Sequence, residues 1–129
     1  MRSLRSAAAL AVTFAAIPGL ASAQELITTY TAQLSQRDHF NSNGQRLTTA
    51  AAIIRQDRAN YHRFGRRDAA DEWDPVFGDM AARARMEALL NAGTSHPSAI
   101  QAIVNGTPIV TVEVWGHAGR IAYVNVIVN

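Results

Sequence analysis

The sequence predicts an α+β domain with the topology β-α-α-α-β-β, in which a three-stranded antiparallel sheet packs on three helices. Residues 26–35 and 109–128 are rich in β-branched residues and carry the two-residue alternation of strands. Residues 48–104 carry apolar residues at helical spacing, interrupted by glycine and proline. The third strand is apolar on both faces, which is typical of a central strand, so we expect the strand order 1-3-2.

The first 23 residues are predicted to be a cleaved signal peptide. Arg2 and Arg5 precede an apolar run over residues 7–17, which Pro18-Gly19 ends, and Ala21-Ser22-Ala23 offers the small residues of a cleavage site. The run is too short for a stable membrane anchor, and no later run is long enough to span a bilayer. We therefore expect residues 24–129 to form one exported domain, periplasmic or extracellular. The alternative is a buried N-terminal helix.

The first strand and the first helix have clear boundaries. Residues 26–35 alternate as LITTYTAQLS, and the turn around Asn43-Gly44 follows. A helix is predicted from about Thr48 to Phe64, with Thr48 or Thr49 as its N-cap and Gly65 at its end.

Two further helices and a hairpin complete the prediction. Asp74-Pro75 is typical of an N-cap followed by the first helical residue, so the second helix is expected from there to about Asn91. A short third helix is expected near Pro97–Val104. Strands at residues 109–115 and 120–128 form the hairpin, joined by Gly116-His117-Ala118-Gly119.

Charge and composition exclude several classes of function. The chain has 12 basic and 10 acidic residues, and every basic residue is arginine. Loss of Arg2 and Arg5 with the leader balances the charges, so we expect no nucleic-acid binding, which needs a basic surplus. The chain has no cysteine, which excludes disulfides and thiolate metal sites. No ligand spacing indicates a metal site, and no motif indicates a cofactor.

The segment RQDRANYHRFGRR, residues 55–67, contains the strongest candidate functional residues. At about 100° per residue from Ile53, Asp57 falls near 40°, within the expected core face of the first helix. A carboxylate there needs a hydrogen-bonding or charged partner. Asp57, with Asn60 at the edge of this face, is therefore predicted to be a structural polar residue that ties down the 37–46 loop or pairs with an arginine. The alternative is a general base or a metal ligand.

The opposite face of this helix carries Arg55, Arg58 and His62. We interpret them as a basic ridge, which is either a solvated helix face or a binding surface for an anion. The expected function is that of a small binding domain, whose partner is an unknown anionic ligand or an exported protein.

A secreted hydrolase, a phosphoesterase or nuclease, is the alternative function. It would use His39, Asp57 and His62 as catalytic groups together with Arg58, because His39 lies near the exit of the first strand and can approach the first helix. This hypothesis requires the four side chains to converge on one accessible pocket.

The block DHFNSNGQRL followed by AAIIRQDRANYHRFGRRD resembles a motif of uncharacterised small exported bacterial proteins. It covers about Arg37–Asp74, a third of the expected mature chain. The resemblance implies export and no particular activity.

One face of the sheet is expected to remain uncovered, because three helices cover only the other. Two sets of side chains follow from the alternation of the hairpin. The set expected to meet the helices is Val110, Val112, Val114, Tyr123 and Ile127. The set expected on the open face is Ile109, Trp115, Val124, Val126 and Val128. We expect the open face to pair with a second copy or another exported protein, or to be covered by a segment of the chain itself.

Overall fold

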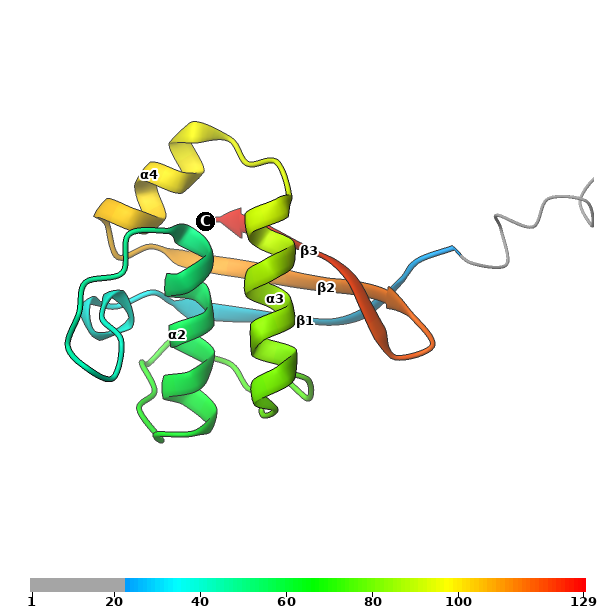
Figure 1. Cartoon of the computed structure of the whole chain (residues 1–129), viewed down its shortest axis with the longest axis horizontal. Helices are drawn as coiled ribbons and strands as arrows, with labels where there is room; N and C mark the ends of the chain where they lie inside the picture. Colours follow the sequence, from blue (N-terminus) through cyan, green and yellow to red (C-terminus); the bar gives the residue numbers. More distant parts are fainter. Residues whose placement is uncertain (1–22) are drawn as a thin grey trace, which may run out of the picture.

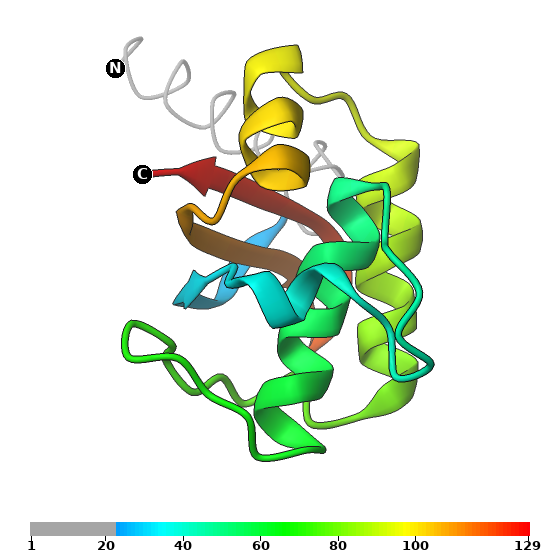
Figure 2. The ribbon, with the colours of Figure 1, turned by 90° about the vertical axis from the view of Figure 1, so that its left-hand side faces the viewer.

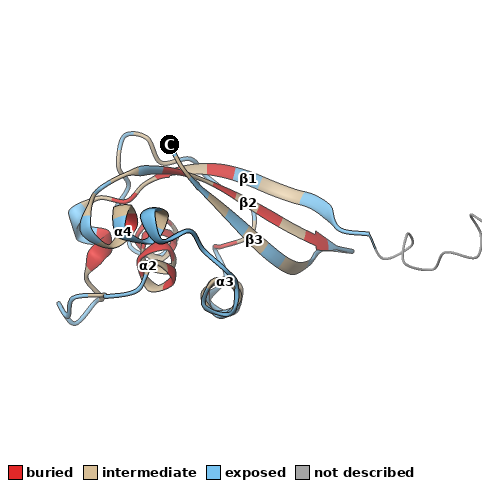
Figure 3. Cartoon of the chain, turned by 90° about the horizontal axis from the view of Figure 1, so that it is seen from above, coloured by how far each residue is buried: buried red, intermediate tan, exposed pale blue. Residues whose placement is uncertain are grey.

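The computed structural model describes residues 23–129 of the 129-residue chain, and the predicted signal peptide, apart from Ala23, lies outside them. In chain order the elements are β1 (Glu25–Gln33), η2 (Gln36–His39), α2 (Ala50–His62), α3 (Met80–Ala92), α4 (Pro97–Asn105), β2 (Ile109–His117) and β3 (Arg120–Val128) (Figure 1). The three α-helices lie on one side of the sheet (Figure 3). The predicted α+β class is therefore confirmed. None of the helices within the described range has the length and hydropathy to cross a membrane.

The strand order is β1-β2-β3, so the predicted order 1-3-2 is wrong. The backbone N–H of Leu34 donates to the carbonyl oxygen of Pro108 over 2.9 Å, which ties the end of β1 to the start of β2. Strands joined in this way run antiparallel as direct neighbours, and the hairpin then places β3 at the edge. Although β3 is apolar on both faces, only one face is buried. On the other face Tyr123 and Ile127 stay 46% and 43% exposed.

A β-bulge between Trp115 and Gly116 sets which side chains of β3 face the helices. The turn pairs His117 with Arg120, but beyond the bulge Trp115 pairs with Tyr123. One extra residue in β3 moves each following side chain to the other face. Gly116 is required at this position because a Cβ there would overlap the carbonyl oxygen of Arg120.

The expected division of the hairpin is therefore only half right. Val110, Val112 and Val114 are fully buried against the helices, as predicted. Their cross-strand partners on the same face are Val128, Val126 and Val124, which were expected on the open face. The open face instead carries Tyr123, stacked on Trp115 at a ring-centroid distance of 5.9 Å, and Ile127.

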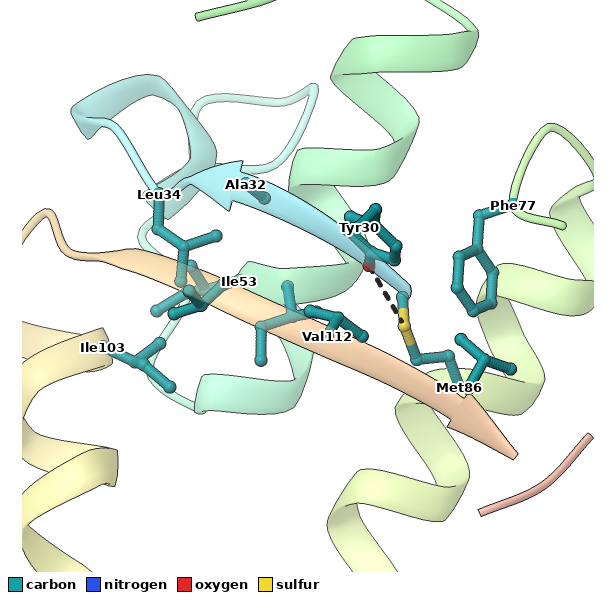
Figure 4. Packing of buried hydrophobic residues seen from close by; sticks show 11 residues of the cluster. Tyr30, Ala32, Leu34, Ile53, Phe77, Met86, Ile103 and Val112 are labelled. Carbon is teal, nitrogen blue, oxygen red and sulfur yellow. Dashed lines mark hydrogen bonds between the residues drawn. The ribbon is translucent and has the colours of Figure 1, made fainter. Parts of the chain in front are cut away.

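The core lies between the sheet and the three helices. Tyr30, Phe77 and Met86 gather at one end of it, where the Tyr30 hydroxyl donates to the Met86 sulfur over 3.9 Å (Figure 4). Phe77 meets Tyr30 edge to face at 6.0 Å. The buried apolar residues come from both the strands and the helices, so the sheet and the helices are stabilised together.

The helix boundaries follow from their caps, with one correction. Thr49 caps α2 by accepting the Ala52 N–H, as predicted. The second helix begins at Met80, capped by Asp79, and not at Asp74-Pro75. Asp74 does accept the N–H groups of Val76 and Phe77, but this turn is not continued into a helix.

Residues 66–79, within the loop that joins α2 to α3, pair with the outer edge of β1. The N–H groups of Thr31 and Gln33 donate to the side chains of Glu72 and Asp71, and the Glu72 N–H donates to the Thr31 carbonyl. The loop therefore covers the edge of the sheet and lies fixed beside α2. On the same side as this loop, α2 also contacts η2, because Ser35 and Arg37 bond to Asp68 of the loop (Figure 2).

Candidate functional site

A chain of buried charged side chains runs from the middle of α2 to the loop. The Asp57 carboxylate accepts the Arg58 Nε–H over 2.8 Å, and Arg58 Nη1 donates to Asp74 over 2.8 Å. His62 Nε2 lies 2.7 Å from the same Asp74 oxygen. Arg58 also donates to the carbonyl oxygen of Glu72 over 2.9 Å, so these bonds hold the 66–79 loop against α2.

The structure places Arg58 in the interior and not on a solvated ridge. Its side chain is fully buried, with the guanidinium 4.1 Å from the ring centroid of Tyr30 and 4.6 Å from that of Tyr61. On the helical wheel with Ile53 at zero, the buried residues of α2 extend from Asn60 at about −20° to Ala51 at about 160°. This buried arc is wider than the core face that was expected from the apolar residues. The extra arc is covered by the polar loop.

Asp57 is buried to 1% exposure and pairs with an arginine, Arg58, and not with the arginines of the 37–46 loop. Burial raises the pKa of Asp57 well above its ordinary value, against the lowering effect of Arg58 and with a further rise from Asp38 and Asp71. Burial also raises the pKa of Asp74, but hydrogen bonds from His62, the backbone and Arg58 more than offset it, so that the net shift is downward. The two carboxyl groups on Arg58 therefore differ in how readily they ionise.

Asn60 and His39 fasten η2 to its neighbours. Asn60 Nδ2 donates to Asp38 over 2.8 Å, across the contact of α2 with η2. The two ring nitrogens of His39 each lie 2.8 Å from a backbone carbonyl oxygen, those of Ser35 and Ile103. His39 therefore links η2 to α4, and its ring nitrogens are directed at backbone oxygens and not at a substrate.

None of the four side chains of the hydrolase hypothesis lines the cavity around Arg55 and Arg83 or the cavity around Trp115 and Tyr123. Asp57 and Arg58 are buried against each other, and His39 is 1% exposed between η2 and α4. His62, with its side chain 10% exposed, is held by Asp74. An acid–base pair acting on a substrate needs an accessible reacting atom within hydrogen-bond reach, and this geometry does not offer one.

The arginine cavity, as we call it, lies between α2, α3 and the loop around Asn41, with a volume of about 270 Å³. Three arginines line it, one of which, Arg55, belongs to the predicted ridge. The other two are Arg63 and Arg83. The remaining lining residues are Asn41, Ser42, Leu47, Ala52, Gln56, Ala59, Phe64, Met80 and Glu87. The cavity therefore combines positive charge with an apolar wall.

Arg83 is the least expected of these residues, because it is buried to 4% exposure on α3 and forms no ion pair within residues 23–129. Its Nη1 donates to the carbonyl oxygen of Phe77 over 2.9 Å. Burial lowers the pKa of Arg83, and the like charges of Arg55 and Arg63 lower it further. An anion placed among these three groups would relieve this repulsion.

The sequence interpretation missed Arg63 and Arg83. Arg63 follows α2 and looks like part of a solvated charge run. Arg83 precedes the buried Met86 by three residues and so lies on the buried face of α3. An arginine within an apolar helix face is the same kind of signal as Asp57 in α2.

Comparisons with protein-family models, with curated proteins and with solved structures find no match to this chain. The inference about function therefore depends on the geometry of the site.

Proposed function

We propose that the chain is an exported binding domain whose ligand is a small anion, a carboxylate or a phosphate ester, carried on an apolar group and held in the arginine cavity. The observation that carries this proposal is the convergence of Arg55, Arg63 and the buried Arg83 on one cavity. A planar guanidinium presents paired donors that match a carboxylate or a phosphate.

The charges within the cavity favour an anion. Arg55 is neutralised by Glu87, whose carboxylate lies 2.7 Å from Arg55 Nη1. Arg63 and Arg83 have no carboxylate partner among the described residues. Two positive charges are therefore left for the ligand. Leu47, Phe64 and Met80 supply an apolar wall, which favours a ligand with an organic body over an inorganic ion.

Arg83→Met tests the proposal with phenyl phosphate and benzoate as probes. The variant keeps much of the length of the side chain and removes the charge. A charge-assisted hydrogen bond contributes about 1.5–3 kcal/mol, so we expect the dissociation constant of the probe that binds to rise about 10- to 100-fold. Isothermal titration calorimetry measures it, and affinity is expected to fall with added salt. Arg63→Ala changes an exposed position and is also expected to raise the dissociation constant of the probe.

Arg85→Ala is the matched control, because Arg85 lies on the same helix but does not line the cavity. Its affinity for the probe is expected to equal that of the wild type. Failure of both probes to bind the wild type at millimolar concentration, or equal affinity in Arg83→Met, would contradict the proposal.

Export has its own test. Expression of the full chain in a bacterium with a general secretion system is expected to yield mature protein that begins at Gln24, because the residues before it end in Ala-Ser-Ala. Mass spectrometry of the periplasmic and medium fractions measures the N-terminus. Mature protein that retains Met1, or that stays in the cytoplasm, would refute export and leave the binding proposal to its own test.

A further inference from the structure

Three aspartates from three separate segments meet beside α2, and we call them the aspartate cluster. Asp38 belongs to η2, Asp57 to α2 and Asp68 to the loop that follows α2. One carboxylate oxygen of each lies within 4.8 Å of those of the other two. Because the residues are distant in the sequence, no spacing reveals the cluster.

Hydrogen bonds inside the protein satisfy two of the three carboxylates. Asp38 accepts from Asn60 at one oxygen and from the Ser35 N–H at the other. Asp68 accepts from the Ser35 hydroxyl over 2.7 Å and from Arg37 over 3.2 Å.

Asp57 differs from the other two members. Arg58 occupies its Oδ2, while Oδ1 is buried and has no hydrogen-bond partner in the described structure. With Oδ2 held by Arg58, Oδ1 is the Asp57 oxygen that remains free to bind a ligand. A buried carboxylate oxygen without a donor is costly unless something else binds it.

The local charge balance is also incomplete. Asp71 lies beside the cluster, where its Oδ2 accepts the Asp68 N–H over 2.8 Å, and it adds a fourth negative charge. Two arginines offset part of this charge, Arg58 on Asp57 and the half-exposed Arg37 on Asp68. When all four carboxyl groups are ionised, their negative charge exceeds the positive charge of the two arginines, and Arg58 also pairs with Asp74. The same crowding contributes to the raised pKa of Asp57.

We propose that the aspartate cluster binds one hard divalent cation, of the Ca²⁺ or Mg²⁺ class, between η2, α2 and the following loop. Every donor group is an oxygen, which suits these ions and not zinc or copper. The unpaired Asp57 Oδ1, an oxygen of Asp38 and an oxygen of Asp68 are the protein ligands, and the Ser35 hydroxyl lies beside the last two. Asp68 is the most exposed member and provides the route to solvent.

The test titrates Ca²⁺ and Mg²⁺ separately into chelator-treated, full-length mature protein, with calorimetry for binding and thermal unfolding for stability. Wild type is expected to bind one ion per chain, with a dissociation constant on the order of 10⁻⁵ to 10⁻³ M. The midpoint of unfolding is expected to rise with cation concentration, because the ion links three segments of the native fold only. Asp57→Asn and Asp68→Asn are expected to reduce affinity at least about 10-fold.

Asp79→Asn is the matched control, since it removes a carboxylate at the N-cap of α3, outside the cluster, and is expected to bind the ion as the wild type does. Asp68 is only partly buried, so Asp68→Asn tests the site even if Asp57→Asn fails to fold. Absence of saturable binding up to about 10 mM of both ions would overturn the proposal. Equal affinity in wild type and Asp68→Asn would overturn it as well.

Discussion

Arg58→Leu is expected to lower the free energy of unfolding by about 3–5 kcal/mol. The leucine fills much of the space but leaves Asp57 and Asp74 buried without their common counter-ion. It also removes the hydrogen bond to the Glu72 carbonyl and the stacking against the rings of Tyr30 and Tyr61. Urea unfolding followed by circular dichroism measures the loss. The total free energy of unfolding of a domain of this size is about 5–15 kcal/mol, so the variant is expected to be only marginally folded.

Two companion variants separate charge from packing. Arg66→Ala removes an exposed arginine of the same segment and is expected to change stability by less than about 0.5 kcal/mol. Asp57→Asn combined with Arg58→Leu removes one of the stranded charges and is expected to recover part of the loss. An unfolding midpoint of Arg58→Leu equal to that of the wild type would mean that the buried chain of charges contributes no net stability.

Gly116→Ala is expected to cost about 3 kcal/mol, at the upper end of what overpacking usually costs. The added Cβ would overlap the Arg120 carbonyl oxygen and meet the Ile27 side chain at 2.7 Å. The closer of these atoms belongs to the backbone, so relief requires the β-bulge to open. The free energy of unfolding measures the cost, and the fluorescence of Trp115, which stacks on Tyr123 across the bulge, reports the rearrangement.

Gly44→Ala and Gly119→Ala are the controls for backbone strain alone. Both glycines have positive φ, 76° and 78°, and a methyl group added at either would meet nothing within 4 Å. An alanine there incurs only the cost of the left-handed conformation, about 1 kcal/mol. If Gly116→Ala cost no more than these two, the close approach to Arg120 would not be what fixes the bulge.

Local signals were sufficient for most of the elements. Thr49 marked the start of α2, which ends at His62, two residues before the expected Phe64. Pro97 marked the start of α4, and β3 was predicted with both of its boundaries. The predicted start of the second helix at Asp74 was wrong, because an aspartate that caps a helix and an aspartate that caps only a loop turn look alike in the sequence. Here the second carboxylate oxygen binds Arg58 and His62, and the helix begins only after Asp79.

The strand order and the site depend on contacts that composition does not encode. An apolar β3 is compatible with either a central or an edge position, and one bulge at Gly116 decided which side chains face the helices. The helix wheel located Asp57 but placed Arg58 in solvent, because the cover for that arc is a polar loop without an apolar pattern. Arg55 lies on α2, Arg63 directly after it and Arg83 on α3, so their convergence on one cavity follows only from the packing of the two helices.

The pairing of β1 with β2 has a consequence for how the chain folds. β1 is the first described element, and its partner comes only after all three helices, with Glu25 opposite Gly116. The three-stranded sheet therefore cannot be completed on a nascent chain, because β1 has no partner until the C-terminal hairpin has been synthesised. In such a topology the chain must lose the entropy of closing a long loop before the contacts between β1 and β2 can form. This loss slows folding relative to helical proteins of the same length. Until the hairpin arrives, Tyr30, Ala32 and the apolar side of α2 remain without the β2 valines that cover them, and in this interval the chain is most open to aggregation or proteolysis.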